Sequence, residues 1–274
     1  MLLRRSLILA AAFLSAAPAA FAADSKSLGK SGVLRVAVYK HFHPFYYDET
    51  GEGIDVDIAR AVAKALDLEV SILPFDADES VDDDLRNMVW RGSLAGYGPA
   101  DLMLHVPVDK RLMAANDKVL IFSPYLREKL QVARNTEKIP EVDGVLSLEG
   151  HLVGTEDASL GSMVLLGEGG AVIREKVRHF PTVRAAAEAM KKGELDAVVG
   201  QRSELQAALG TEAHVEVGPL RARTAPPNGW VVGMSVRKED EALAKAVDGV
   251  IKEMARSGQL KAIFAKHGVE WMHP

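Results

Sequence analysis

Residues 33–73 read VLRVAVYKHFHPFYYDETGEGIDVDIARAVAKALDLEVSIL, and this stretch decides the fold class. Residues 33–38 alternate in the way that a first strand does. Two glycines and several acids within residues 48–53 indicate a turn. Apolar residues then recur at helical spacing, and residues 68–73 alternate again; the helical positions are Ile54, Val56, Ile58, Val62, Ala63 and Leu66. The order strand, helix, strand predicts an open α/β sheet.

The rest of the chain also predicts helices that alternate with strands. We expect helices at 81–91, 160–177, 183–192 and 239–266, and strands at 100–105, 119–123, 129–133, 151–155, 195–199, 214–217 and 229–235. The strands at 129–133 and 229–235 flank a block that has its own strand–helix order. We therefore predict a lobe 1 in two pieces (23–128 and 229–274), a lobe 2 (129–228) inserted into it, and two hinge strands between them. The APPNG sequence at 225–229 predicts a stiff turn before the return crossing.

Composition excludes several classes of protein. The chain has 274 residues, of which 48% are hydrophobic and 26% charged, so it can bury a large core and is neither disordered nor collagen-like. It contains no cysteine, which excludes disulfide scaffolds, thiolate zinc sites and cysteine nucleophiles. The formal net charge is -5, and this acidic balance argues against a nucleic-acid partner.

The amino terminus has the layout of a secretory signal peptide. Arg4 and Arg5 precede an apolar run at 7–14, and small residues then end in the Ala-Phe-Ala sequence at 20–22. We predict that residues 1–22 are removed after Ala22 and that the mature protein is exported, soluble and free of the membrane. The alternative is an uncleaved anchor, but the apolar run is short for a bilayer span.

Several short motifs follow one another in a definite order along the chain. They are LRVAV at 34–38 with HPF at 43–45, GIDVDI at 53–58, DKR at 109–111 with FSPY at 122–125, VGT at 153–155, GELDAVV at 193–199, and SGQL at 257–260 with KHG at 266–268. This set resembles the bacterial periplasmic solute-binding proteins of the polar-amino-acid type, family 3. The resemblance implies a periplasmic location and a type II periplasmic-binding-protein fold, in which two α/β lobes close on a ligand by hinge motion.

The same resemblance implies where a ligand would bind. Arg111 corresponds to the arginine that holds an α-carboxylate, although Val108 stands where the family has a threonine. Ala158 and Ser159 correspond to the glycine–threonine pair at a helix start in the second lobe. Gln201 replaces the acid that pairs with a ligand ammonium, and a neutral amide is a poor partner for a buried ammonium. Aromatic residues that stack on a ligand would be Phe45 and Tyr46.

A second resemblance concerns residues 90–109. Trp90-Arg91-Gly92, the segment GYGPADLMLHVPVD at 96–109 and FSPYLRE at 122–128 resemble the MxaJ/XoxJ branch of the solute-binding fold. That branch is associated with methanol dehydrogenases that depend on pyrroloquinoline quinone. The resemblance implies a monomeric accessory protein without a cofactor of its own, which helps the apo-dehydrogenase to become active. Its partner surface would include Trp90, Tyr97 and Trp230.

Three alternatives remain beside this accessory role. The first is a receptor for an ABC importer that binds a small organic acid or an amino-acid-like solute. The second is a dehydratase on the same fold, although lone cleft acids such as Asp55 or Glu156 do not form an acid–base pair. The third is a metal site made by His41, His43 and His105, for which cleft-wall histidines are the favoured interpretation. We therefore expect a protein that is not an enzyme and that binds no metal.

Overall fold

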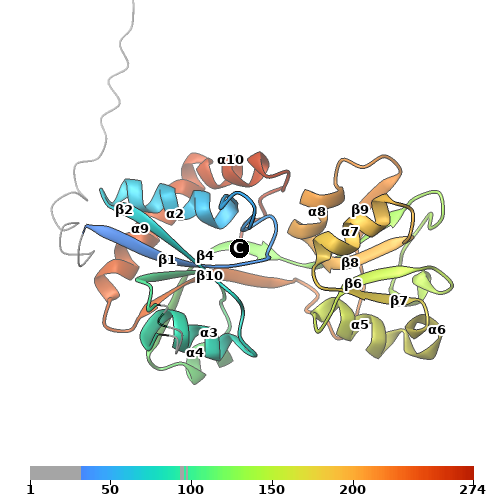
Figure 1. The fold of residues 1–274 in the computed structure, drawn as a ribbon, viewed down its shortest axis with the longest axis horizontal. Coiled ribbons are helices and arrows are strands. Elements are labelled where there is room, and N and C mark those ends of the chain that lie inside the picture. Colours follow the sequence, from blue (N-terminus) through green and yellow to red (C-terminus); the bar gives the residue numbers. More distant parts are fainter. Residues whose placement is uncertain (1–31, 93–95, 97) are drawn as a thin grey trace, which may run out of the picture.

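The computed structural model describes residues 32–92, 96 and 98–274, which form two lobes side by side (Figure 1). The predicted signal peptide and Tyr97 lie outside the described residues. In the described part of the chain, no helix is long and apolar enough to cross a membrane.

Lobe 1 is built on a five-stranded sheet with the strand order β2-β1-β3-β10-β4. Its strands are β1 (Val33–Tyr39), β2 (Glu69–Phe75), β3 (Leu102–Pro107), β4 (Val119–Glu128) and β10 (Trp230–Arg237). β1 pairs in parallel with β2 and β3, whereas β10 runs antiparallel to β3 and β4. One face is covered by α2 (Ile54–Ala65), α9 (Glu241–Ser257) and α10 (Gln259–Lys266), and the other by α3 (Val81–Leu85), η1 (Arg86–Trp90) and α4 (Lys110–Ala115).

Lobe 2 has the same layered design around a second sheet, with the order β7-β6-β8-β5-β9. Its strands are β5 (Leu130–Asn135), β6 (Val153–Glu156), β7 (Val177–Phe180), β8 (Ala197–Gln201) and β9 (Val215–Pro219). α5 (Leu160–Glu168) and α6 (Gly170–Arg174) pack on one face together with η2 (Val145–Leu148). α7 (Val183–Lys191) and α8 (Arg202–Leu209) pack on the other face.

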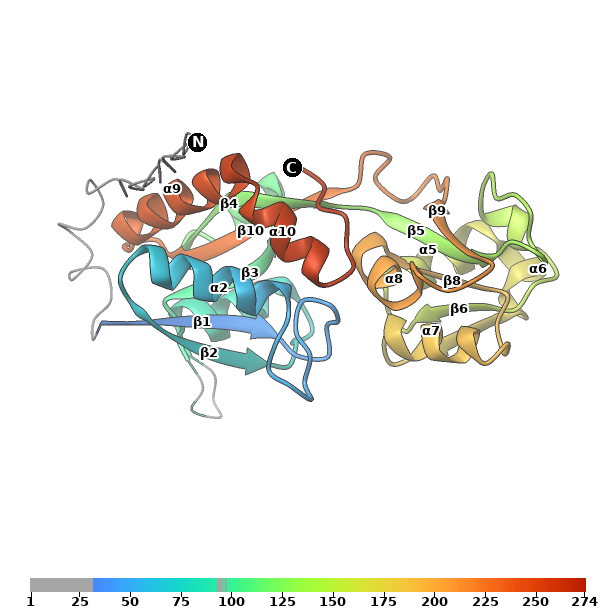
Figure 2. The same ribbon diagram turned by 90° about the horizontal axis from the view of Figure 1, so that it is seen from above.

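The chain changes sheet twice, once directly and once through a longer segment. The first sheet ends at Glu128 and the second begins at Leu130, so Lys129 alone separates β4 from β5. The return runs from Pro219 to Trp230, and Trp230 pairs with Glu128 in the register of β10 and β4. The two crossings therefore lie next to each other, which is the geometry of a hinge between two packed lobes (Figure 2).

The opening strand–helix–strand unit is confirmed as β1, α2 and β2. The predicted helix at 239–266 is two helices, because Gly258 takes a left-handed φ of 82° and ends α9. The predicted helix at 160–177 ends early at the glycines between α5 and α6, and its last residue begins β7. Sequence patterns missed the short helices α4 and α8 and the strand β7.

Candidate functional site

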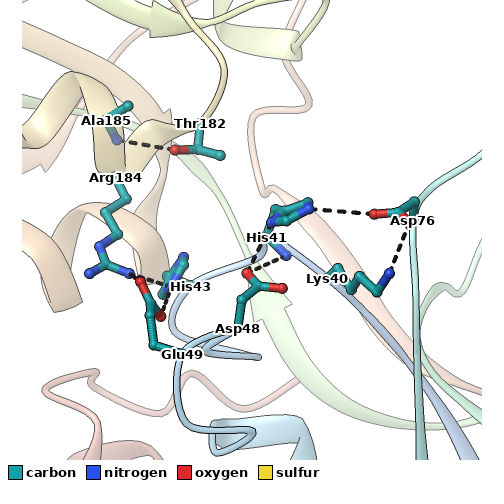
Figure 3. A network of polar contacts seen from close by, with 9 residues as sticks. All are labelled: Lys40, His41, His43, Asp48, Glu49, Asp76, Thr182, Arg184 and Ala185. Carbon is teal, nitrogen blue, oxygen red and sulfur yellow. Dashed lines mark hydrogen bonds and ion pairs between the residues drawn. The ribbon is translucent and has the colours of Figure 1, made fainter.

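A pocket of about 500 Å³ opens between the two lobes. One wall is the loop after β1 in lobe 1, and the other is the first turns of α7 in lobe 2. Its lining residues are His41, His43, Asp48, Glu49, Thr182, Arg184, Ala185 and Glu188. Because its two walls belong to different lobes, any change in the lobe angle changes this pocket (Figure 3).

The loop that carries the lobe 1 wall is held by its own backbone. Phe45 and Tyr46 donate backbone N–H groups to the carbonyl of Phe42, and Ile54 donates to the carbonyl of Pro44. Gly53 has a φ of 143°, and a Cβ there would lie 2.1 Å from the carbonyl oxygen of Phe45. The loop therefore folds tightly back onto the start of α2.

This tight loop corrects the expectation for the stacking aromatics. Phe45 is 1% exposed and Tyr46 is 8% exposed, and both belong to the core of lobe 1. The ring of Phe45 packs against His105 at a centroid distance of 4.2 Å. The two rings are therefore inside the lobe, and neither offers a free face to a ligand in the cleft.

Arg184 joins the two lobes across the pocket. Its Nη1 donates to Oε1 of Glu49 at 2.9 Å and to Nε2 of His43 at 2.5 Å. His43 also lies 3.4 Å from Oε2 of Glu49. Figure 3 shows the Arg184 side chain reaching from α7 toward these two residues of the loop. The contact places one arginine, one carboxylate and one imidazole in a single cluster.

The pKa values of His43 and Glu49, the two lobe 1 members of the cluster, are both lowered. Burial lowers the pKa of His43, and the nearby charge of Arg184 lowers that pKa further. A hydrogen bond from the backbone of Glu49 to its own carboxylate lowers the pKa of that carboxyl, as do the contact with His43 and the hydrogen bond from Arg184. At neutral pH the cluster therefore holds a neutral imidazole between a fixed cation and a fixed anion.

His41 belongs to a separate set of contacts on the same loop. Its Nδ1 lies 3.0 Å from Asp48, and its Nε2 lies 3.4 Å from Asp76, which also pairs with Lys40 at 3.0 Å. His105 lies elsewhere, inside lobe 1. Within the described ranges no three histidine or acidic side chains come together as a metal site.

The residues predicted to hold a carboxylate lie outside this pocket. Arg111 is exposed on the first turn of α4, where the Asp109 side chain accepts its backbone N–H. Ser159 caps α5: its hydroxyl accepts the N–H of Ser162 and donates to the carbonyl of Glu156. Ala158 is exposed, with a left-handed φ of 52°. A helix does start at Ser159, but the hydroxyl of Ser159 already has partners, and its role toward a ligand stays a prediction.

Gln201 lies at the start of α8, where it makes no side-chain cap. Its amide oxygen is buried and has no hydrogen-bond partner among the described residues. Burial raises the pKa of Glu204, three positions further along the helix, well above its usual value, and the charges of Glu156 and Glu128 raise it further. Acids therefore do lie close to position 201, although Glu204 is buried, and the motif at that position did not indicate them.

A buried ion pair at the hinge was also missed. Glu128 is 0% exposed and Arg202 is 2% exposed, with 3.8 Å between Oε1 of Glu128 and Nε of Arg202. Nη1 of Arg202 donates to the carbonyl of Glu270 at 2.7 Å, so the pair also ties α8 to the carboxy-terminal segment. No spacing rule links residues 128 and 202, and only the crossing of the chain brings them together.

Asp55 is not a cleft acid as the sequence suggested. It is 1% exposed and accepts the hydroxyl of Tyr125 at 2.8 Å, with Nδ1 of His105 at 3.4 Å. Burial raises the pKa of Tyr125 well above its usual value, and the charge of Asp55 raises it further. This trio lies beneath Phe45 and forms part of the interior of lobe 1.

The two described tryptophans of the expected partner surface lie in different settings. Trp90 is 37% exposed at the end of η1. Trp230 is half-buried and packs against the core of lobe 1 at the return crossing. Of the two, Trp90 alone offers an open apolar face.

Searches with protein-family models and among curated proteins find no match. Solved structures do match. An ancestral cationic amino acid solute-binding protein is 20% identical, covers 89% of this chain and 99% of its own, and gives a TM-score of 0.70. An amino acid ABC transporter substrate-binding protein from Streptococcus pneumoniae, bound to L-arginine, is 18% identical, with coverage of 89% and 97% and a TM-score of 0.64. The fold is that of the two-lobed solute-binding proteins.

The predicted two-lobed solute-binding fold is therefore confirmed. A further match with this fold is an ancestral amino-acid-binding protein described as a precursor of cyclohexadienyl dehydratase, 20% identical, with coverage of 89% and 99% and a TM-score of 0.61. These matches are to amino-acid-binding proteins and do not bear on the MxaJ/XoxJ branch, which stays a prediction.

Proposed function

We propose that this protein is the extracytoplasmic receptor of an importer and binds a small solute between its lobes. The observation that carries this proposal is the pocket whose walls come from both lobes. The lobes are joined by two adjacent crossings, so the angle between them can change. A solute that contacts both walls of the pocket stabilises the closed arrangement of the lobes, in which both walls reach it. We also propose that the protein is not an enzyme.

The solute class rests on the residues that the family resemblance assigns to a carboxylate, which lie outside the pocket in this arrangement of the lobes. Arg111 is exposed on α4, with the charge of Asp109 nearby. A guanidinium fork suits a carboxylate, and the amino-terminal end of α5 carries a dipole that favours an anion. We therefore propose a small organic acid or an amino-acid-like solute, held after further closure of the lobes.

A panel of amino acids and organic acids should reveal such a solute by thermal unfolding. A solute at a hundred times its Kd adds about 2.7 kcal/mol to the stability. For a chain of this size that is a rise in Tm of about 5–10 °C. Arg111→Ala should reduce the affinity at least about thirtyfold, because it removes the charged hydrogen bonds.

The matched control is Arg178→Ala, which removes an exposed arginine of β7. It should leave the affinity unchanged. If no solute raises the Tm, or if both variants lose affinity equally, the receptor proposal fails.

A second candidate is the accessory role toward a methanol dehydrogenase that depends on pyrroloquinoline quinone. It is favoured by the neutral Gln201 in place of an acid and by the exposed face of Trp90. The apo-dehydrogenase mixed with this protein should then give a complex by native mass spectrometry. Trp90→Ser should weaken that complex, and the absence of any complex would remove this candidate.

Export is part of both candidates. If residues 1–22 are a signal peptide, protein isolated from the periplasm begins at Ala23, which amino-terminal sequencing can show. Turnover of a prephenate-like substrate, by contrast, would show that the protein is a dehydratase and would replace both candidates.

A further inference from the structure

The cluster of Arg184, His43 and Glu49 is a contact between lobes that uses no ligand. Residues 43 and 184 are 141 positions apart, and their side chains meet only because the loop after β1 lies against the start of α7. We propose that this cluster is a latch that holds the lobes together at neutral pH and releases them in acid.

The hydrogen bonds fix the protonation state that the latch requires. The guanidinium of Arg184 has donors only, so Nε2 of His43 must accept. An imidazole that accepts at Nε2 is neutral and carries its proton on Nδ1. That Nδ1 is buried and has no hydrogen-bond partner among the described residues. A second proton on His43 would leave Arg184 facing another donor and would turn the contact from attraction into repulsion.

The other charged groups around His43 do not cancel the effect of its protonation on the contact with Arg184. Glu49 and Asp48 lie on its own loop, and both favour the protonated imidazole. Oε2 of Glu49 lies 3.4 Å from the same Nε2 of His43, but Oε1 of Glu49 is engaged by Arg184. Asp48 is engaged by His41, and Glu188 lines the lobe 2 wall of the pocket. Tyr47 contacts the ring of His43 edge-on at a centroid distance of 4.9 Å. Burial and Arg184 outweigh the two acids, because the pKa of His43 is lowered.

The sign of the pH effect follows directly. The latched state binds a proton on His43 less readily than the open state does. The latch is therefore at full strength above the ordinary histidine pKa of about 6.5, and it weakens as the pH falls below that value. The pKa of Glu49 is also lowered, so its contribution is lost only in stronger acid, below its ordinary pKa of 4.5. Between about pH 7.5 and 5.0 the change within the latch is therefore expected from His43 and not from Glu49.

The test measures the distance between the lobes without any solute. The chain has no cysteine, so Lys64→Cys on α2 and Glu175→Cys after α6 provide one label site on each lobe. We expect the population at short distance to fall between about pH 7.5 and about pH 5.0. Each unit by which the latch lowers the pKa of His43 changes the ratio of latched to open molecules up to tenfold.

Two variants separate the latch from other titrations. His43→Gln keeps an acceptor for Arg184 but cannot be protonated, so it should remain latched at both pH values. Arg184→Gln should be open at both. If the distance does not depend on pH, or if His43→Gln responds as the wild type does, the latch is disproved. The importance of the latch for uptake rests on the proposed receptor function, but this measurement contains no solute and succeeds or fails independently of it.

Discussion

Replacing Arg202 with methionine is expected to lower the free energy of unfolding by about 3–5 kcal/mol. Arg202 is 2% exposed, and its partner Glu128 is fully buried at the end of β4. The substitution leaves the Glu128 carboxylate without its cation and removes the hydrogen bonds that Arg202 donates to Gln206 and to the carbonyl of Glu270. Chemical denaturation of the variant and the wild type measures the loss.

The pH dependence of that loss identifies its cause. Burial raises the pKa of Glu128, so the folded state takes up a proton there more readily than the unfolded state does. Without Arg202 this pKa should rise further, and the cost of the substitution should therefore grow as the pH increases from about 5 to about 8. A loss of stability that is equal at both pH values would contradict an electrostatic origin.

Two controls complete the experiment. The double variant Glu128→Leu with Arg202→Met removes both charges, and it should recover most of the stability, because well-packed apolar residues replace a buried pair at little cost. Arg256→Met removes an exposed arginine that pairs with Glu253 on α9, and it should leave the stability almost unchanged.

Sequence patterns predicted correctly those helices and strands in which buried residues recur at a regular spacing. The strand at 33–38, the helix from residue 54 and the strand at 68–73 were predicted because each buries residues at a regular period. The break between α9 and α10 also had a local signal, since Gly258 stands within Ser257-Gly258-Gln259. A glycine inside a long helical pattern is a candidate for a helix end, and here the structure uses it as one.

The site could be predicted only in part, because it is made by contacts between distant segments. The motif at 43–45 indicated a cleft loop, but it could not show that backbone hydrogen bonds turn Phe45 inward and leave His43 at the pocket. Arg184 lies on α7. The spacing of the apolar residues in this helix predicts only which face is buried in lobe 2, and that face is not the one that carries Arg184. The role of Arg184 as a bridge appears only when α7 is placed against the other lobe.

Alanine in place of Gly229 is expected to lower the free energy of unfolding by about 2–4 kcal/mol. Gly229 has a φ of 70°, and a Cβ there would lie 1.8 Å from the carbonyl oxygen of Glu128. The atom that it would meet is backbone at the end of β4, so no side chain can move aside. The two crossings must separate instead, and the label pair on the lobes should report a changed distance at neutral pH.

Gly193→Ala is the matched control for this change. Gly193 has a similar φ of 77°, but nothing lies within 4 Å of the Cβ that alanine would add, so its cost should be limited to backbone strain of about 1 kcal/mol. The lobe distance should not change in that variant. If the two glycines tolerate alanine equally, close contact between the crossings does not set the hinge. Because the strain of the positive φ is common to both sites, the difference between the two variants isolates the collision between the two hinge strands.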